Sequence, residues 1–141
     1  SNSTVFLSAN TAASRALVQE VDLSGSTGNV TFNAGNFTNA FKSLIGGSGN
    51  DSLFVSNAIA NAPTLSIDAG AGNDRINFVN TKSAVASASS LTGGEGGDTF
   101  VLTGGSNLVA ANSTAALKAS LTTITDFNAA QDTLNITGMA L

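Results

Sequence analysis

The chain of 141 residues contains no cysteine, histidine, tryptophan or tyrosine, and only one proline. Without cysteine it can form neither disulfide bonds nor thiolate metal sites. Without histidine it lacks both the imidazole metal ligand and the most frequent general acid–base catalyst. Charged residues make up only 10% of the sequence and give a net charge of −4. The five basic residues are scattered, which argues against nucleic acid as a partner.

Long apolar runs are also missing, since none approaches the roughly 20 residues that span a bilayer as a helix. We therefore expect no membrane insertion. The sequence shows no signal peptide and no initiator methionine, so we expect Ser1 to begin a processed chain or an excised fragment. Apolar residues amount to 42%, enough for the core of one domain that spans residues 1–141.

Three glycine-rich segments share the pattern G-G-x-G-x-D-x-U-x, in which U is a large apolar residue. They are residues 46–54, 69–77 and 93–101, and the second has alanine at the first glycine position. Glycine lets the backbone turn through positive φ and direct its carbonyl oxygens inward, and the aspartate adds a carboxylate. Such oxygen donors suit a hard cation, and the sequence therefore predicts Ca²⁺ as the cofactor.

These glycine loops belong to a longer period. Gly25, Gly47, Gly70 and Gly94 follow one another at nearly equal spacing, and each lies between two short apolar segments. One turn of the chain, a rung, is then a strand, a glycine loop, a second strand and a longer return segment. Stacked rungs bury a common apolar stripe. The sequence thus predicts an all-β, parallel β-roll or β-solenoid with one calcium loop per rung of about 23–24 residues. The predicted strands include residues 4–8, 16–23, 30–32, 44–45, 53–55, 65–67, 76–78, 90–91 and 100–102.

The rungs fall into three groups along the chain. Residues 1–43 form rungs without calcium, because the loop at residues 25–29 lacks the aspartate, and residues 44–102 form the calcium rungs. In the cap at residues 103–141, Ser113 can begin a short helix over residues 113–121, which either covers the open end of the solenoid or lies on the surface. The return segments, residues 56–64 and 80–89, are expected to be ordered, with flexible linkers as the alternative.

The glycine loops and the end of the chain resemble the RTX (repeats-in-toxin) family of secreted bacterial proteins. The family's closing motif, D-F-x-x-x-x-D-x-U-x-U, matches Asp126-Phe127 and Asp132-Thr133-Leu134-Asn135-Ile136, with Ala129-Ala130 where members often carry glycine. The resemblance covers about residues 44–138. It implies calcium along one side of the solenoid, an extracellular or cell-surface location, and type I secretion directed by a C-terminal signal within residues 126–141.

The resemblance also implies a set of metal ligands. Each Ca²⁺ would lie between two successive loops, with side-chain oxygens from Asp51, Asp74 and Asp98. Further ligands in the same loops would come from the backbone of Gly46, Ser48, Gly49, Ala69, Ala71, Gly72, Gly93, Glu95 and Gly96. Asp126 and Asp132 would be either ligands or turn caps. The side chains of Asp68 and Glu95 would face solvent, with a contribution of outer oxygens to the site as the alternative. Asn50 and Asn73 would support a left-handed backbone. The alternative is that all three loops are turns without metal.

In its wide loop spacing and low charge, the chain is similar to surface-layer (S-layer) and adhesin-type RTX proteins. This similarity implies a structural module that self-associates or contacts cell-surface glycan or lipopolysaccharide, and that folds when it meets calcium outside the cell. The alternative is the folding and secretion domain of an RTX hydrolase, a protease or lipase with its catalytic domain upstream. Catalysis within this chain is not expected, because no motif positions a nucleophile or a carboxylate pair. Ice binding would need regular outward ranks of threonine, which the sequence does not show.

Overall fold

Every regular element that the structure describes is a β-strand, which confirms the predicted all-β class. The structure is a computed structural model, and it describes residues 3–6, 18–34, 41–56, 64–80, 89–104 and 122–137. The strands are β1 (Ser3–Phe6), β2 (Glu20–Asp22), β3 (Val30–Ala34), β4 (Ser43–Ile45), β5 (Ser52–Ser56), β6 (Ser66–Asp68), β7 (Arg75–Asn80), β8 (Ser89–Thr92), β9 (Thr99–Gly104), β10 (Thr122–Ile124) and β11 (Thr133–Thr137).

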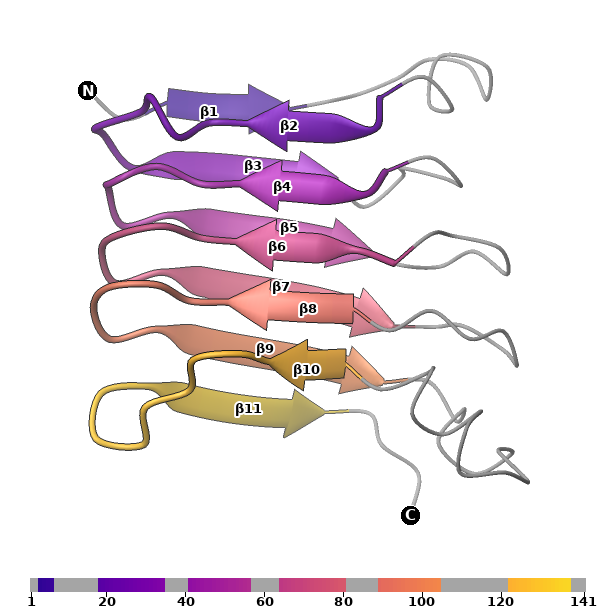
Figure 1. The fold of residues 1–141 in the computed structure, drawn as a ribbon, viewed down its shortest axis with the longest axis vertical. Coiled ribbons are helices and arrows are strands. Elements are labelled where there is room, and N and C mark those ends of the chain that lie inside the picture. The colour runs from indigo at the N-terminus through magenta and orange to yellow at the C-terminus, as the bar shows by residue number, and fades with distance from the viewer. Residues whose placement is uncertain are drawn as a thin grey trace.

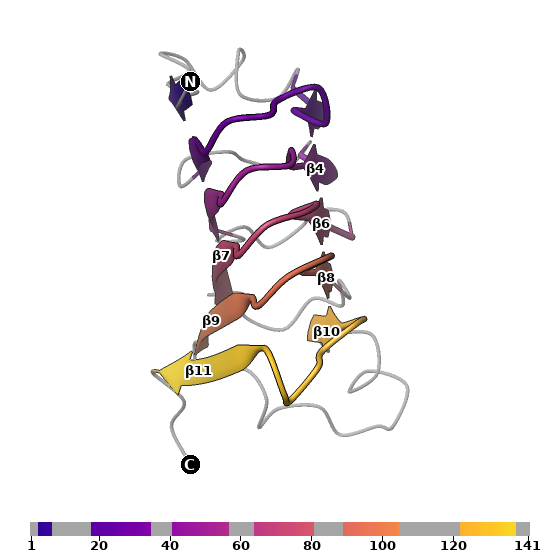
Figure 2. The same ribbon diagram turned by 90° about the vertical axis from the view of Figure 1, so that its left-hand side faces the viewer.

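The strands form two parallel sheets that face each other. Sheet A has the order β1-β3-β5-β7-β9-β11, and sheet B has the order β2-β4-β6-β8-β10. Successive strands alternate between the two sheets, so the chain winds through one rung after another (Figures 1 and 2). This winding confirms the parallel β-roll that the repeat period predicts.

The register of the strands reproduces the sequence period. Leu53 pairs with Ile76, Ile76 with Phe100, and Phe100 with Leu134. The offsets in residue number are therefore the same as those between the successive aspartates, namely 23, 24 and 34. Every glycine loop leads from a strand of sheet B to a strand of sheet A, and all of them lie along one edge of the solenoid, on the left in Figure 1.

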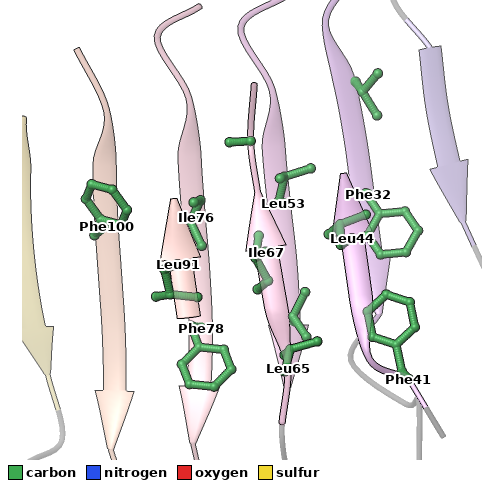
Figure 3. Packing of buried hydrophobic residues seen from close by; sticks show 13 residues of the cluster. Phe32, Phe41, Leu44, Leu53, Leu65, Ile67, Ile76, Phe78, Leu91 and Phe100 are labelled. Carbon is green, nitrogen blue, oxygen red and sulfur yellow. The ribbon is translucent and has the colours of Figure 1, made fainter. Parts of the chain in front are cut away.

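The core is built from stripes of apolar side chains that point inward from both sheets (Figure 3). In β5 the exposure alternates, with Leu53 and Val55 buried and their neighbours partly exposed, as expected for a strand with one face in the core. Burying a large aliphatic or aromatic side chain contributes about 1.5–3 kcal/mol, so this stripe is the main driving force for stacking the rungs. The buried apolar residues of the described part are Val30, Phe32, Phe41, Leu44, Leu53, Val55, Leu65, Ile67, Ala69, Ile76, Phe78, Leu91 and Phe100.

Several sequence predictions fall wholly or partly outside the described residues. These are the helix at residues 113–121, residues 57–63 and 81–88 of the return segments, and the ends of the strands predicted at residues 4–8 and 16–23. Within the described part, the second of these strands is limited to β2. No described segment is a helix that could cross a membrane.

The outer face of sheet A has no continuous rank of threonine. The residues that follow one another across its strands at the first outward position are Thr31, Ser52, Arg75, Thr99 and Thr133. Serine and arginine interrupt the threonines at the centre of this column.

Candidate metal site in the stacked glycine loops

The second and third glycine loops, residues 69–74 and 93–98, have a backbone that only glycine tolerates. Gly70 and Gly72 have φ of 104° and 129°, and Gly94 and Gly96 have φ of 99° and 126°. A Cβ atom on Gly94 would overlap the carbonyl oxygen of Gly70 in the loop above. Glycine is therefore needed twice over, for the positive φ and for the close approach of one loop to the next.

The first glycine loop, residues 46–51, has a different conformation. Neither Gly47 nor Gly49 has a φ in the left-handed region, although this segment fits the sequence pattern at every position. It packs against the loop at residues 23–29, which has no aspartate, and a Cβ on Gly47 would overlap the carbonyl oxygen of Ser26. A full match to the sequence pattern is therefore not sufficient for the positive-φ conformation.

Backbone hydrogen bonds join the loops to one another. The Ala71 amide donates to the Gly47 carbonyl at 3.0 Å, and the Glu95 amide donates to the Gly70 carbonyl at 3.0 Å. In the opposite direction, the Gly72 amide donates to the Glu95 carbonyl at 2.7 Å. These bonds continue the parallel pairing of the strands around the edge of the solenoid.

The aspartates of the loops form a ladder that runs through four rungs. One carboxylate oxygen, Oδ1, of each aspartate accepts the backbone amide of the equivalent residue in the preceding rung. The amides of Val30, Asp51, Asp74 and Asp98 donate in this way to Asp51, Asp74, Asp98 and Asp132, over 2.8, 2.7, 2.9 and 2.9 Å. Asp51, Asp74 and Asp98 are each 2% exposed. The structure thus brings these three predicted residues into one buried column and adds Asp132.

The second carboxylate oxygen, Oδ2, separates the four aspartates into two pairs. In Asp51 it accepts the Gly47 amide at 2.9 Å, and in Asp132 it accepts the Asn128 amide at 2.7 Å, so both carboxylates are closed by their own loops. The Oδ2 atom of Asp74 is buried and has no hydrogen-bond partner among the described residues. Leaving a charged oxygen in this state is costly, so this position calls for a positive partner or a proton.

The electrostatics of the column agree with this geometry. Burial raises the pKa of Asp74 from 3.8 to about 7, opposed by the hydrogen bond from the Asp51 amide and assisted by the negative charges of Asp51, Asp98 and Asp68. Burial likewise raises the pKa of Asp98, with further contributions from the charges of Asp132 and Asp126. Without a cation, the two inner aspartates of the ladder therefore resist ionisation.

The backbone supplies further oxygen donors. Of the nine backbone groups expected as ligands, only the carbonyl of Glu95 accepts a hydrogen bond from the described residues, donated by the Gly72 amide. The other eight carbonyls accept none, and they belong to Gly46, Ser48, Gly49, Ala69, Ala71, Gly72, Gly93 and Gly96. No group of three acidic side chains converges in the described part, so carbonyls must provide most of any coordination shell. A buried carboxylate oxygen without a partner and several unpaired carbonyls form a donor set that fits Ca²⁺.

Asp126 caps the third loop. Its two oxygens accept the amides of Gly93 at 3.0 Å and Gly94 at 2.7 Å. The equivalent amide in the rungs above, that of Gly46 or Ala69, donates to a backbone carbonyl of the next rung instead. The side chain of Asp126 therefore replaces that carbonyl where the chain leaves the regular repeat. The side chains of Asp68 and Glu95 lie exposed.

A second ladder was not foreseen from the sequence. The side-chain oxygens of Asn29, Asn50 and Asn73 accept the amides of Asn50, Asn73 and Gly97, over 2.9, 2.9 and 2.8 Å. Asn50 and Asn73 thus connect rungs, beyond the local backbone role expected of them. The available signal was the recurrence of asparagine directly before the aspartate position at the rung period.

Comparison with known proteins agrees with the loops and the fold. Searches among curated proteins and among solved structures gave no match. A family model described as "Peptidase M10 serralysin C terminal" matches residues 6–141, nearly the whole chain. This region is the non-catalytic RTX repeat domain of its family, and RTX repeats bind Ca²⁺ and belong to proteins exported by type I secretion. The RTX resemblance is thereby confirmed, and the chain belongs to the peptidase M10 serralysin C-terminal family of calcium-binding repeat domains.

Proposed function

We propose that this chain is a calcium-dependent folding module of a secreted bacterial protein. The observation that carries the proposal is the buried Oδ2 atom of Asp74, which has no hydrogen-bond partner in the described part of the chain. With Asp98 and the unpaired loop carbonyls, this oxygen would hold Ca²⁺ in the glycine loops. Bound Ca²⁺ supplies the positive charge that a desolvated carboxylate column needs.

The calcium level of the surroundings then controls folding. Extracellular modules bind Ca²⁺ with dissociation constants of about 10⁻⁴–10⁻³ M. At around 1 mM Ca²⁺, each independent site adds about 0.4–1.4 kcal/mol of stability, from RT ln(1 + [Ca]/Kd). At the sub-micromolar calcium of a cytosol this contribution vanishes, and the loop acids repel one another. The module would therefore stay loosely folded until export.

A calcium titration of the chain tests this proposal. After EDTA treatment, Ca²⁺ should raise the melting temperature in far-UV circular dichroism, and Mg²⁺ should have little effect. Asp74→Asn should reduce the rise in melting temperature that Ca²⁺ causes. The control is Asp68→Asn, which changes an exposed aspartate at the end of β6 and should leave this rise intact. A melting curve indifferent to Ca²⁺ would mean that the loops are turns without metal.

Two settings for the module follow from different observations. The single glycine loop per rung and the low charge favour a structural module of an S-layer or adhesin-type protein, with self-association or contact to cell-surface glycan or lipopolysaccharide. The match to a peptidase family favours the C-terminal folding and secretion domain of a hydrolase. Assaying the product of the whole gene for proteolysis and for lipase activity separates them, because only the second setting predicts a hydrolytic activity.

A further inference from the structure

The four aspartates of the ladder fall into two classes, as their second carboxylate oxygens show. Asp51 and Asp132, at the two ends of the column, are each closed by the amide four residues earlier in their own loop. The equivalent amide of the third loop, that of Gly94, donates to Asp126 instead, and no described amide donates to Oδ2 of Asp98. In the second loop, Oδ2 of Asp74 is buried without a partner.

The backbone makes the same division. The second and third loops carry positive-φ glycines at matching positions, Gly70 with Gly94 and Gly72 with Gly96. They are also joined by a parallel bridge between Ala71 and Glu95. The first loop has neither of its equivalent glycines in this conformation. It therefore differs from the other two glycine loops despite its full match to the calcium pattern.

We propose that the carboxylate ligands for calcium come from Asp74 and Asp98 alone, and that Asp51 is a clamp that closes the first glycine loop without metal. This inference rests on the proposed calcium binding and narrows it, because the sequence pattern assigns a ligand to each of the three loops. The solenoid is then divided in function. The rungs up to the first glycine loop fold against one another without the ion. The calcium-dependent loops then stack on the last of these folded rungs.

The hydrogen bonds support this division energetically. A carboxylate that accepts two or three backbone amides is already stabilised in its charged form, and a metal would have to displace those amides. In the first loop, displacement would leave the Val30 and Gly47 amides without their acceptor, which costs the desolvation of two buried donors. In the second loop, Oδ2 of Asp74 has no such partner to lose.

Matched asparagine variants test the assignment by isothermal titration calorimetry with CaCl₂. Asp74→Asn and Asp98→Asn should each lose a bound ion or weaken Ca²⁺ binding by roughly tenfold or more, since each removes a charged ligand. Asp51→Asn should keep the number of ions and a dissociation constant within about threefold of the wild type. Asp132→Asn, at the other closed aspartate, should behave like Asp51→Asn. If Asp51→Asn loses as much binding as Asp74→Asn, the assignment is wrong.

Melting temperatures in EDTA give a second readout, in which the two classes of aspartate variant should change in opposite directions. Asp51→Asn should melt below the wild type, because it replaces one acceptor by a donor that faces the Gly47 amide. Asp74→Asn should melt above the wild type, because it removes the negative charge of a buried carboxylate whose Oδ2 has no hydrogen-bond partner in the described part. Equal changes of the same sign would contradict the division into two classes.

NMR of ¹⁵N-labelled wild type keeps the test decisive if Asp51→Asn does not fold. The Val30 and Gly47 amides should be protected from hydrogen exchange in EDTA and should move little when CaCl₂ is added. The Gly70, Gly72 and Gly96 amides should shift strongly. Large shifts and new protection at Gly47 would overturn the clamp. A wild type that binds no Ca²⁺ by calorimetry would instead refute the proposed function itself, so the two failures are distinguishable.

Discussion

The metal-free protein should be more stable at pH 5.5 than at pH 8. In the folded chain, burial raises the pKa of Asp74 from 3.8 to about 7. Between these values the folded state holds a proton that the unfolded state has lost, so folding is favoured on the acid side of the window. This advantage is complete below the unfolded pKa and is lost as the pH rises through 7. The pKa of Asp98 is also raised by burial, which adds to the effect in the same direction.

The magnitude follows from the change in pKa. One pKa unit corresponds to 1.36 kcal/mol, so between pH 5.5 and the folded pKa of about 7 the protein loses about 2 kcal/mol of this stabilisation. Screening by solvent at the loop edge reduces the loss to about 1 kcal/mol. For a chain of this size, that corresponds to about 4 °C in melting temperature. The change in stability between pH 5.5 and 8 can be assigned to these aspartates, because the chain has no histidine and few other groups titrate in this range.

The assay is thermal unfolding by far-UV circular dichroism in EDTA at both pH values. Asp74→Asn should flatten the difference, because its side chain does not titrate. In 5 mM CaCl₂ the difference should shrink, since Ca²⁺ competes with the proton for the same oxygen and stabilises the ionised carboxylate most at pH 8. Higher stability of the metal-free wild type at pH 8, or an undiminished difference in Asp74→Asn, would refute the reasoning.

Three further predictions concern the stability of the fold, each measured by urea denaturation. Gly94→Ala should lower the free energy of unfolding by about 2 kcal/mol or more, because alanine is strained at this φ and its Cβ would overlap the Gly70 carbonyl. The control variant Gly25→Ala has open space for its Cβ and should change the free energy of unfolding by less than about 0.5 kcal/mol. Equal effects of the two would contradict the close stacking of the loops. Asp126→Ala should cost about 1–2 kcal/mol, because it leaves the amides of Gly93 and Gly94 without an acceptor, and a neutral result would mean that water replaces the cap. Ser89→Ala should raise stability by about 1 kcal/mol, because the buried Oγ has no hydrogen-bond partner among the described residues, and a loss would reveal one.

The solenoid could be predicted from the sequence because its period and its strand pattern agree. Glycines at nearly constant intervals mark one edge of each rung, and apolar residues such as Leu53 and Ile76 mark the inward face beside it. Each signal lies within one rung, so it can be recognised in the sequence without knowing how neighbouring rungs pack. Even the wider interval from Asp98 to Asp132 is visible in the sequence, and it recurs in the register of β9 and β11.

The site was less predictable because its interactions are not local. The pairs that form the two ladders, such as Asp51 with Asp74 and Asn50 with Asn73, are 23 residues apart and meet only once the rungs are in register. The conformation of the first glycine loop could not be inferred either. The pattern of residues 46–51 permits positive φ, but neither Gly47 nor Gly49 has it, and the preceding loop approaches this segment closely at Ser26.

The two edges of the solenoid differ in how much variation they tolerate. On the glycine edge, the links from β4 to β5, β6 to β7 and β8 to β9 all have six residues, whereas the returns from β5 to β6, β7 to β8 and β9 to β10 have nine, eight and 17. Lengthening a return from eight to 17 residues costs only about 0.7 kcal/mol in loop-closure entropy. The return edge is thus the natural place to graft a foreign peptide or epitope, while the three six-residue glycine links are left unchanged.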